Sequence, residues 1–154
     1  DAGAMQAACF LRENGFSPAF AGRVGDCIRT HRFRSSAPPE SLEAKILFDA
    51  DKIDSSGAMG VARTLLYQGQ MGQPLYTLRP DGRISDGQGE KTPSFFREYR
   101  RKLEGLGDRL YTSRGRVMAA QRRDAAAAFY QNLLDEARAA GDGERVPPTL
   151  WERP

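Results

Sequence analysis

Three carboxylates within six residues are the side chains of this chain best suited to metal chemistry. Asp49, Asp51 and Asp54 lie in the segment 43–60, whose other residues follow an apolar, helical pattern. An ionised carboxylate is costly to bury unless it is paired or binds a cation. Hard divalent cations such as Mg²⁺ or Mn²⁺ prefer oxygen ligands of this kind. The segment therefore predicts a cation site near the end of a buried helix.

Helix geometry separates the roles of the three acids. Asp49 and Asp51 lie about 200° apart around a helix, so both cannot face one metal ion directly. Asp54 follows Asp51 by three residues and could share its face. Asp51 lies on the inner face at the helix end, beside a Gly-rich turn. The simpler alternative is a surface acid paired with Lys52 or Lys45.

A second group of polar residues is suited to binding an anion. His31, the only histidine, ends an apolar stretch and is followed by Arg32, Phe33 and Arg34. Two guanidinium groups near one imidazole can bind a phosphate through charge-assisted hydrogen bonds. A lone histidine is more often structural, and the arginines are also typical of a solvated basic turn.

The elements that must position these residues are all helices. We expect helices over 1–14, from Ser17-Pro18 toward His31, from Ser41 through Asp51, over 58–68, from Thr92-Pro93 to about 106, and from Ser113 to Ala140. Ser17 and Ser41 are predicted N-caps. The expected core face is Leu42, Ile46, Leu47 and Ala50 in the third helix, and Val61, Leu65 and Leu66 in the fourth. No strand pattern is convincing, so the predicted class is all-α.

Residues 1–140 are expected to form one domain, and 141–154 a loosely held tail. The segment 69–91 is rich in Gly, Gln, Pro and Asp. Loops of this length without secondary structure are usually functional or disordered. We therefore predict a mobile lid beside the site, with its tip around Asp81-Gly82-Arg83.

The bulk composition restricts the class of protein and of partner. The chain has 154 residues, a net charge of +3 and a pI of about 9.1. This mildly basic charge suits an anionic ligand but is too weak to predict nucleic-acid binding. No apolar run approaches the ~20 residues of a membrane span, and no signal peptide is visible. Cys9 and Cys27 form no disulfide framework, which favours a cytoplasmic location.

Several motifs together resemble HD-domain phosphohydrolases, and a bacterial subgroup in particular. These are "AACFLRENGFS" (7–17), "CIRTHRFR" (27–34), "AKILFDADKID" (44–54) with the residues after it to 68, and "SFFREYRRKLEGLGDRLYTSRGRVMAAQRR" (94–123). The resemblance implies an HD-domain-like helical bundle with a divalent metal, Mn²⁺, Mg²⁺ or similar, at its centre. It implies a phosphohydrolase acting on a small phosphorylated substrate, in particular a nucleotide, by attack of metal-activated water on phosphorus.

The resemblance also implies roles for individual residues. Asp51 matches the final metal ligand, and Asp54 would orient a ligand or a water beside it. His31 would contact the substrate phosphate or a second metal. The remaining phosphate-binding candidates are Arg32, Arg34, Lys52, Arg63 and Arg109. For Arg109, whose segment would fold back over the site, an ion pair in a helix connector is an equal alternative.

The chain departs from the family pattern because it contains one His and no His-Asp pair. We expect the missing motifs upstream of residue 1; otherwise the site has been lost. The second case predicts a catalytically inactive relative that binds a nucleotide or a protein. A helical interaction module without a small ligand is a third interpretation, in which the Gly-rich loop and the last helix form the surface.

Overall fold

The structure is a computed structural model, and it describes residues 1–32 and 37–142. Arg34 and most of the predicted tail lie outside these residues. The described part is helical, with the elements α1 (Ala2–Glu13), α2 (Pro18–Thr30), α3 (Leu42–Asp54), α4 (Gly57–Gln70), α5 (Phe95–Glu98) and α6 (Ser113–Asp142). A π-helix, η1 (Tyr99–Leu103), continues α5, and a 3₁₀ turn, η2 (Gly107–Arg109), precedes α6. No strand occurs in the described ranges, where Leu78 and Ile84 form one isolated bridge. The all-α prediction is confirmed.

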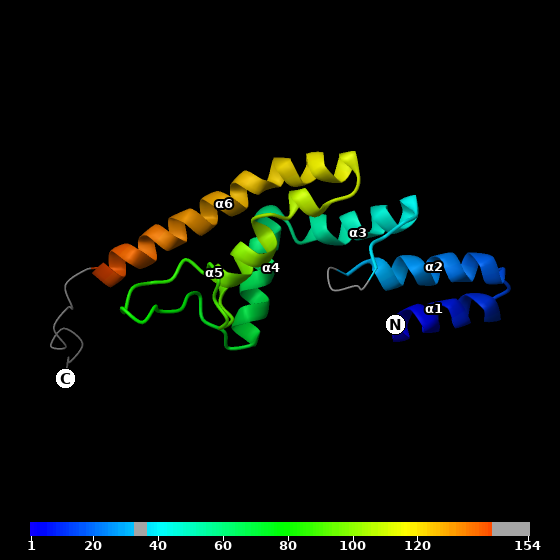
Figure 1. Cartoon of the computed structure of the whole chain (residues 1–154), viewed down its shortest axis with the longest axis horizontal. Helices are drawn as coiled ribbons and strands as arrows, with labels where there is room; N and C mark the ends of the chain where they lie inside the picture. Colours follow the sequence, from blue (N-terminus) through cyan, green and yellow to red (C-terminus); the bar gives the residue numbers. More distant parts are fainter. Residues whose placement is uncertain (33–36, 143–154) are drawn as a thin grey trace, which may run out of the picture.

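The helices form an elongated arrangement (Figure 1). α1 and α2 make a hairpin at one end, α3 joins this hairpin to the rest, and α6 runs from beside α3 to the opposite end of the molecule. α4 packs against α6 near its middle. No helix of the described residues is long and apolar enough to cross a membrane.

Helix starts follow the capping chemistry of the sequence. The Ser17 hydroxyl accepts a hydrogen bond from the Phe20 N–H at 3.2 Å, and the Ser41 hydroxyl accepts one from the Ala44 N–H at 3.1 Å. Both predicted N-caps are confirmed. The predicted helix start at Thr92-Pro93 is wrong. Ser94 is the N-cap, its hydroxyl accepts a hydrogen bond from the Arg97 N–H, and the helix begins at Phe95.

Two clusters of buried side chains form the core. The larger joins α4, α5, η1 and α6 and consists of Val61, Ile84, Phe95, Phe96, Tyr99, Ala126, Tyr130 and Leu134. The smaller consists of Ile53, Leu106, Leu110 and Ala119, with Met118 packed against it. The larger cluster holds α4 against α6, and the smaller one holds the end of α3 against α6 and the residues that flank η2.

The predicted core face of α3 is wrong. Leu42, Ile46 and Leu47 are exposed, whereas Ala44, Phe48, Asp49, Lys52 and Ile53 are buried. Apolar residues occur all round this helix, so its contacts with α2 and α6 decide which side is covered. In α4, Val61 is buried and Leu65 packs on the core as expected, but Leu66 is exposed.

The long segment after α4 is partly packed, contrary to the mobile-lid prediction. Ile84 and Ser85 are buried, and the Ser85 N–H donates to the Thr77 carbonyl at 2.9 Å. The Tyr130 hydroxyl of α6 donates to the Asp86 carbonyl at 2.7 Å. These contacts make the second half of the segment part of the scaffold, while the turn at Asp81 and Gly82 stays exposed.

Candidate functional site

The candidate site is a cavity of about 640 Å³ between the end of α3, α4 and the α5–η1 segment. Three of the residues predicted from sequence, Asp51, Lys52 and Arg63, line it. Other polar side chains also line it: Ser55, Thr64, Tyr67, Gln68, Gln73, Arg97, Glu98, Arg101 and Lys102. The cavity thus collects five cationic groups and two carboxylates.

Lys52 is the buried centre of this site. Its side chain is only 7% exposed, and its ammonium group donates to the Asp51 carboxylate at 2.5 Å and to the His31 carbonyl at 2.8 Å. The same group lies 4.7 Å from the centre of the Phe48 ring. Lys52 therefore links the cavity to the end of α2. Its contact with Asp51 agrees with the alternative given above, in which Asp51 pairs with Lys52.

Asp54 and Arg63 form an ion pair at the edge of the site. Both side chains are more than half exposed, so the pair contributes little to stability. Asp54 does not line the cavity of Asp51; it lines an apolar cavity on another face, with Leu42, Ile46 and Met118. Any influence of Asp54 on the site is therefore exerted through the guanidinium of Arg63.

The opposite wall is organised by Glu98. Its carboxylate pairs with Arg97 at 3.2 Å, Arg101 at 3.0 Å and Lys102 at 2.5 Å. Burial opposes ionisation of Glu98, but the hydrogen bonds and charges of Lys102 and Arg101 outweigh burial and lower its pKa. Arg97 also donates to the Glu90 carbonyl at 2.7 Å, which fixes this wall to the packed segment.

The other predicted anion-binding residues lie elsewhere. Arg32 and Arg109 line a cavity of about 570 Å³, together with Tyr111, Arg116 and Pro39. Arg109 also donates to the Arg101 carbonyl at 2.9 Å. The side chain of His31 lines a smaller cavity of about 280 Å³ beside α1, shared with Arg32. Its Nδ1 lies 2.5 Å from the Ile28 carbonyl, which requires that nitrogen to be the donor.

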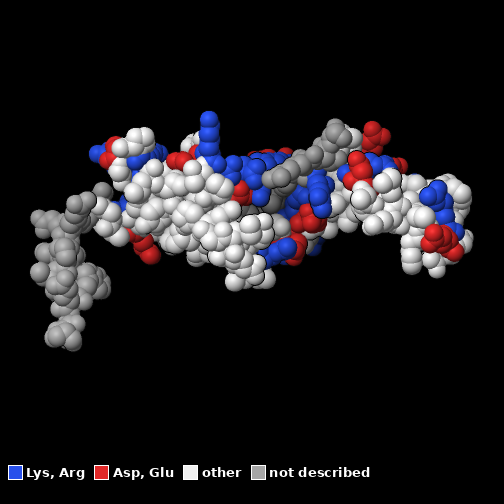
Figure 2. Space-filling view, turned by 90° about the horizontal axis from the view of Figure 1, so that it is seen from below, with Lys and Arg blue, Asp and Glu red and all other residues white. Residues whose placement is uncertain are grey.

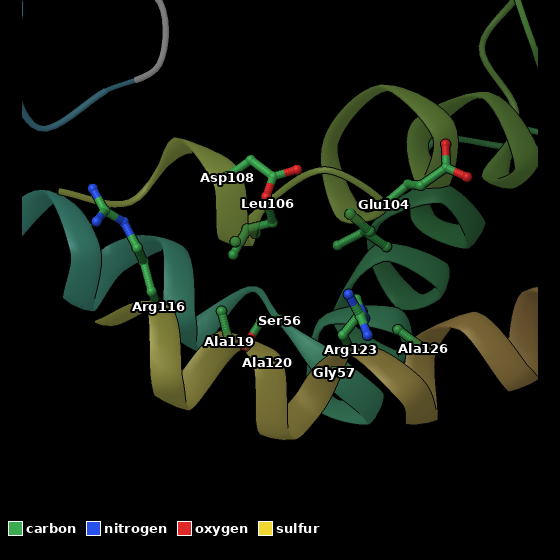
Figure 3. Close-up of a pocket in the computed structure, with 12 residues that line it drawn as sticks. Ser56, Gly57, Glu104, Leu106, Asp108, Arg116, Ala119, Ala120, Arg123 and Ala126 are labelled. Atoms are coloured by element: carbon green, nitrogen blue, oxygen red, sulfur yellow. The ribbon is translucent and has the colours of Figure 1, made fainter. Parts of the chain in front are cut away.

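A further cavity, of about 370 Å³, lies between α6, the start of α4 and the segment from Leu103 to Asp108. Small side chains of α6 such as Ala119 and Ala120 lie opposite the segment that carries Leu106 and Asp108 (Figure 3). None of the residues predicted above to bind metal or phosphate lines it.

Figure 2 shows Lys and Arg side chains together with acidic ones near the middle of the visible face, beside an uncharged surface, and further charged side chains at both ends.

Sequence reasoning missed the role of Asp49, which is 2% exposed. Its carboxylate accepts hydrogen bonds from the Tyr111 N–H at 2.9 Å, the Thr112 N–H at 2.7 Å and the Thr112 hydroxyl at 2.6 Å. A negative charge there is favourable, since α6 begins at Ser113. Asp49 thus ties α3 to the start of α6.

Sequence reasoning also missed Gln68, Arg97, Glu98 and Arg101. The spacing of Glu98 to Arg101 and Lys102, three and four residues apart, is a signal for ion pairs on one helical face. Nothing in the spacing brings this face opposite Asp51, because the two segments are separated by the packed loop.

The chain was compared with known protein families and with curated proteins. No protein-family model matches the chain. It is 31% identical over 117 residues to the uncharacterized protein YpgQ of Bacillus subtilis, a match that covers 73% of this chain and 51% of YpgQ. The chain therefore spans about half the length of this curated relative.

Solved structures of similar proteins share the fold of this chain. The crystal structure of B. subtilis YpgQ in complex with ADP is 27% identical, covers 86% of this chain and 61% of YpgQ, and has a TM-score of 0.66. An HD-superfamily hydrolase from Bacillus thuringiensis is 27% identical, covers 88% of this chain and 62% of its own, and has a TM-score of 0.63. The chain is thus all-helical, and it shares its fold with HD-superfamily proteins.

Proposed function

We propose that the protein is an HD-type phosphohydrolase acting on a small phosphorylated substrate, a nucleotide. The single observation that carries the proposal is the cavity in which Asp51, Lys52 and Arg63 meet a second row of cations. The similarity to an HD-superfamily hydrolase supports the reaction class, and the ADP complex of YpgQ supports the class of ligand.

The cavity residues would bind and orient a phosphate group. Arg63 is exposed, held by Asp54, and presents a planar guanidinium that suits two phosphate oxygens at once. Lys52 is already engaged by Asp51 and by the His31 carbonyl. Its buried charge raises the positive potential of the cavity and positions Asp51. His31 enters this site through its backbone carbonyl, and a direct contact of its ring or of Arg32 with phosphate remains part of the proposal.

A divalent metal such as Mn²⁺ or Mg²⁺ is proposed at Asp51 on the basis of the family resemblance. Among residues 1–32 and 37–142, no group of three His, Cys, Asp or Glu side chains converges as a metal site would require. The ammonium of Lys52 also occupies one side of the Asp51 carboxylate. The described residues therefore do not form a metal centre by themselves, and Asp51 would supply one ligand among others.

The test is an assay of hydrolysis on a panel of nucleoside mono-, di- and triphosphates with Mn²⁺ or Mg²⁺. The quantity measured is the release of phosphate or pyrophosphate. We expect turnover that Asp51→Asn lowers by roughly 10²-fold or more. Arg63→Ala should raise KM, whereas Arg23→Ala, an exposed arginine of α2 outside the cavity, should not. Activity unchanged in Asp51→Asn would contradict the assigned site.

The second candidate function is nucleotide binding without catalysis. It is favoured by the lack of converging metal ligands among the described residues. Calorimetry on the same panel separates the two functions. Binding of a nucleotide that is never hydrolysed under any metal condition would support the binding module and contradict the hydrolase.

A further inference from the structure

Gln68 is a buried amide whose hydrogen-bonding groups have no partner in the described part of the protein. The residue lies in α4 and is 3% exposed, yet neither Nε2 nor Oε1 makes a hydrogen bond there. Buried Ser56, Ser85 and Ser94 each make one. Because an unpaired buried polar group lowers stability, such a group indicates a role other than folding.

Two other atoms share this condition, but neither has the same significance. Arg100 lacks a partner at Nε, but its other two nitrogens bond Glu104 and Asp86. Thr77 lacks one at Oγ1 and does not line the candidate cavity. Gln68 alone of these three lines the cavity that also holds Asp51.

The position of Gln68 fits a ligand that extends from the charged end of the cavity. Arg63, the arginine proposed to bind phosphate, precedes Gln68 in α4 by five residues. At 1.5 Å per residue this is about 7.5 Å along the helix. Both residues line the candidate cavity, and exposed Tyr67 lies beside Gln68. The cavity thus has a phosphate-binding end and an end with an amide and an aromatic ring.

We infer that Gln68 recognises the base of the nucleotide, with adenine as the preferred base. The inference rests on the proposed function. A glutamine amide offers a donor and an acceptor side by side, which match the paired N6–H and N7 groups of adenine. The neighbouring phenol ring of Tyr67 offers a surface on which a base can stack.

The experiment compares Gln68→Met with wild type in the full chain, using ADP and pyrophosphate as separate probes in calorimetry. Methionine has a similar length but no amide, so we expect ADP to bind about tenfold more weakly. Pyrophosphate, which has no base, should bind within about twofold of wild type. Because the amide is unpartnered, the Met variant should also melt at a higher temperature than wild type. Gln70→Met, an exposed position of the same helix outside the cavity, should change neither affinity.

The outcomes distinguish this inference from the proposed function. If ADP and pyrophosphate bind the Met variant as they bind wild type, the base-recognition role is wrong while the phosphate site stands. If ADP and pyrophosphate weaken equally, Gln68 acts on the cavity as a whole and the inference is also wrong. If wild type binds neither probe, the proposed function itself is overturned, and the inference with it.

Discussion

The carboxylate of Asp49 accepts hydrogen bonds from both the N–H and the hydroxyl of Thr112, which lies 63 residues later in the chain. This contact joins α3, which carries the candidate site residues Asp51 and Lys52, to the start of α6. The Thr112 hydroxyl in turn accepts a hydrogen bond from the Gly115 N–H at 2.9 Å, so one carboxylate organises the whole helix start.

Replacement of Asp49 is expected to destabilise the fold. Asp49→Asn removes the charge and turns an amide toward two N–H donors, which should cost about 2–3 kcal/mol in the free energy of unfolding. Urea denaturation followed by circular dichroism measures this loss. The matched control is Asp54→Asn on the same helix, whose exposed ion pair is worth at most about 1 kcal/mol. Equal losses in the two variants would show that the Asp49 contact is not important.

Gly115 is predicted to tolerate no side chain. A Cβ at this position would lie 2.5 Å from Oδ2 of Asp49 and 2.9 Å from Oγ1 of Thr112. Gly115→Ala should therefore destabilise by about 1–3 kcal/mol. At Gly22 in α2 a Cβ would have no neighbour within 4 Å, so Gly22→Ala should instead stabilise by about 0.5–1 kcal/mol. Thermal melts of both variants test the opposite signs.

The packed segment after α4 is expected to contribute to stability. Ile84 is buried at 8% exposure, and Ile84→Ala should cost about 2–4 kcal/mol. Its bridge partner Leu78 is 63% exposed, so Leu78→Ala should change the unfolding midpoint only slightly. A stable Ile84→Ala protein with altered substrate preference would instead restore the mobile-lid hypothesis.

Stability is expected to fall in acid because two carboxyl groups have lowered pKa values in the folded state. For Asp86, burial opposes ionisation, but the Gln88 N–H, Arg79 and Arg100 outweigh it. The pKa of Glu98 is lowered by Lys102 and Arg101 despite burial. Between the ordinary and the lowered pKa, the unfolded chain binds more protons than the folded one. Stability is therefore present above the ordinary values of 3.8 and 4.5 and is lost as the pH falls through the folded values.

Urea titrations at several pH values below 5 measure this dependence. Glu98→Gln should remove the contribution of Glu98 to the pH dependence of the free energy of unfolding, because glutamine does not titrate in this range. Glu43→Gln, at the first turn of α3 and exposed, serves as the control. A slope that is the same in wild type and in Glu98→Gln would show that Glu98 does not contribute.

Sequence patterns predicted the helices better than their faces. Ser17 and Ser41 mark helix starts through local capping, which needs no knowledge of distant residues. The prediction of the buried side of α3 is wrong because this side depends on the contact of Asp49 with Thr112, which is distant in the sequence. Asp51, Lys52 and Arg63 were predicted as site residues and line one cavity, since they lie close together on consecutive helices. Gln68 carried no signal in the sequence, because burial without a partner is visible only in three dimensions.

The π-helix Tyr99–Leu103 has a consequence for changes in the length of this chain. Its wider turn, closed by the Glu104 N–H and the Tyr99 carbonyl at 2.9 Å, holds one residue more than a regular helical turn. Loss of a single residue here would convert the wide turn into a regular one, and the residues on either side would keep their relative orientation because the wide turn already absorbs the extra residue. Leu103 and Leu106 line both the candidate cavity and the cavity of Figure 3, so a chain one residue shorter here would change the wall that the two cavities share while the rest of the segment keeps its direction.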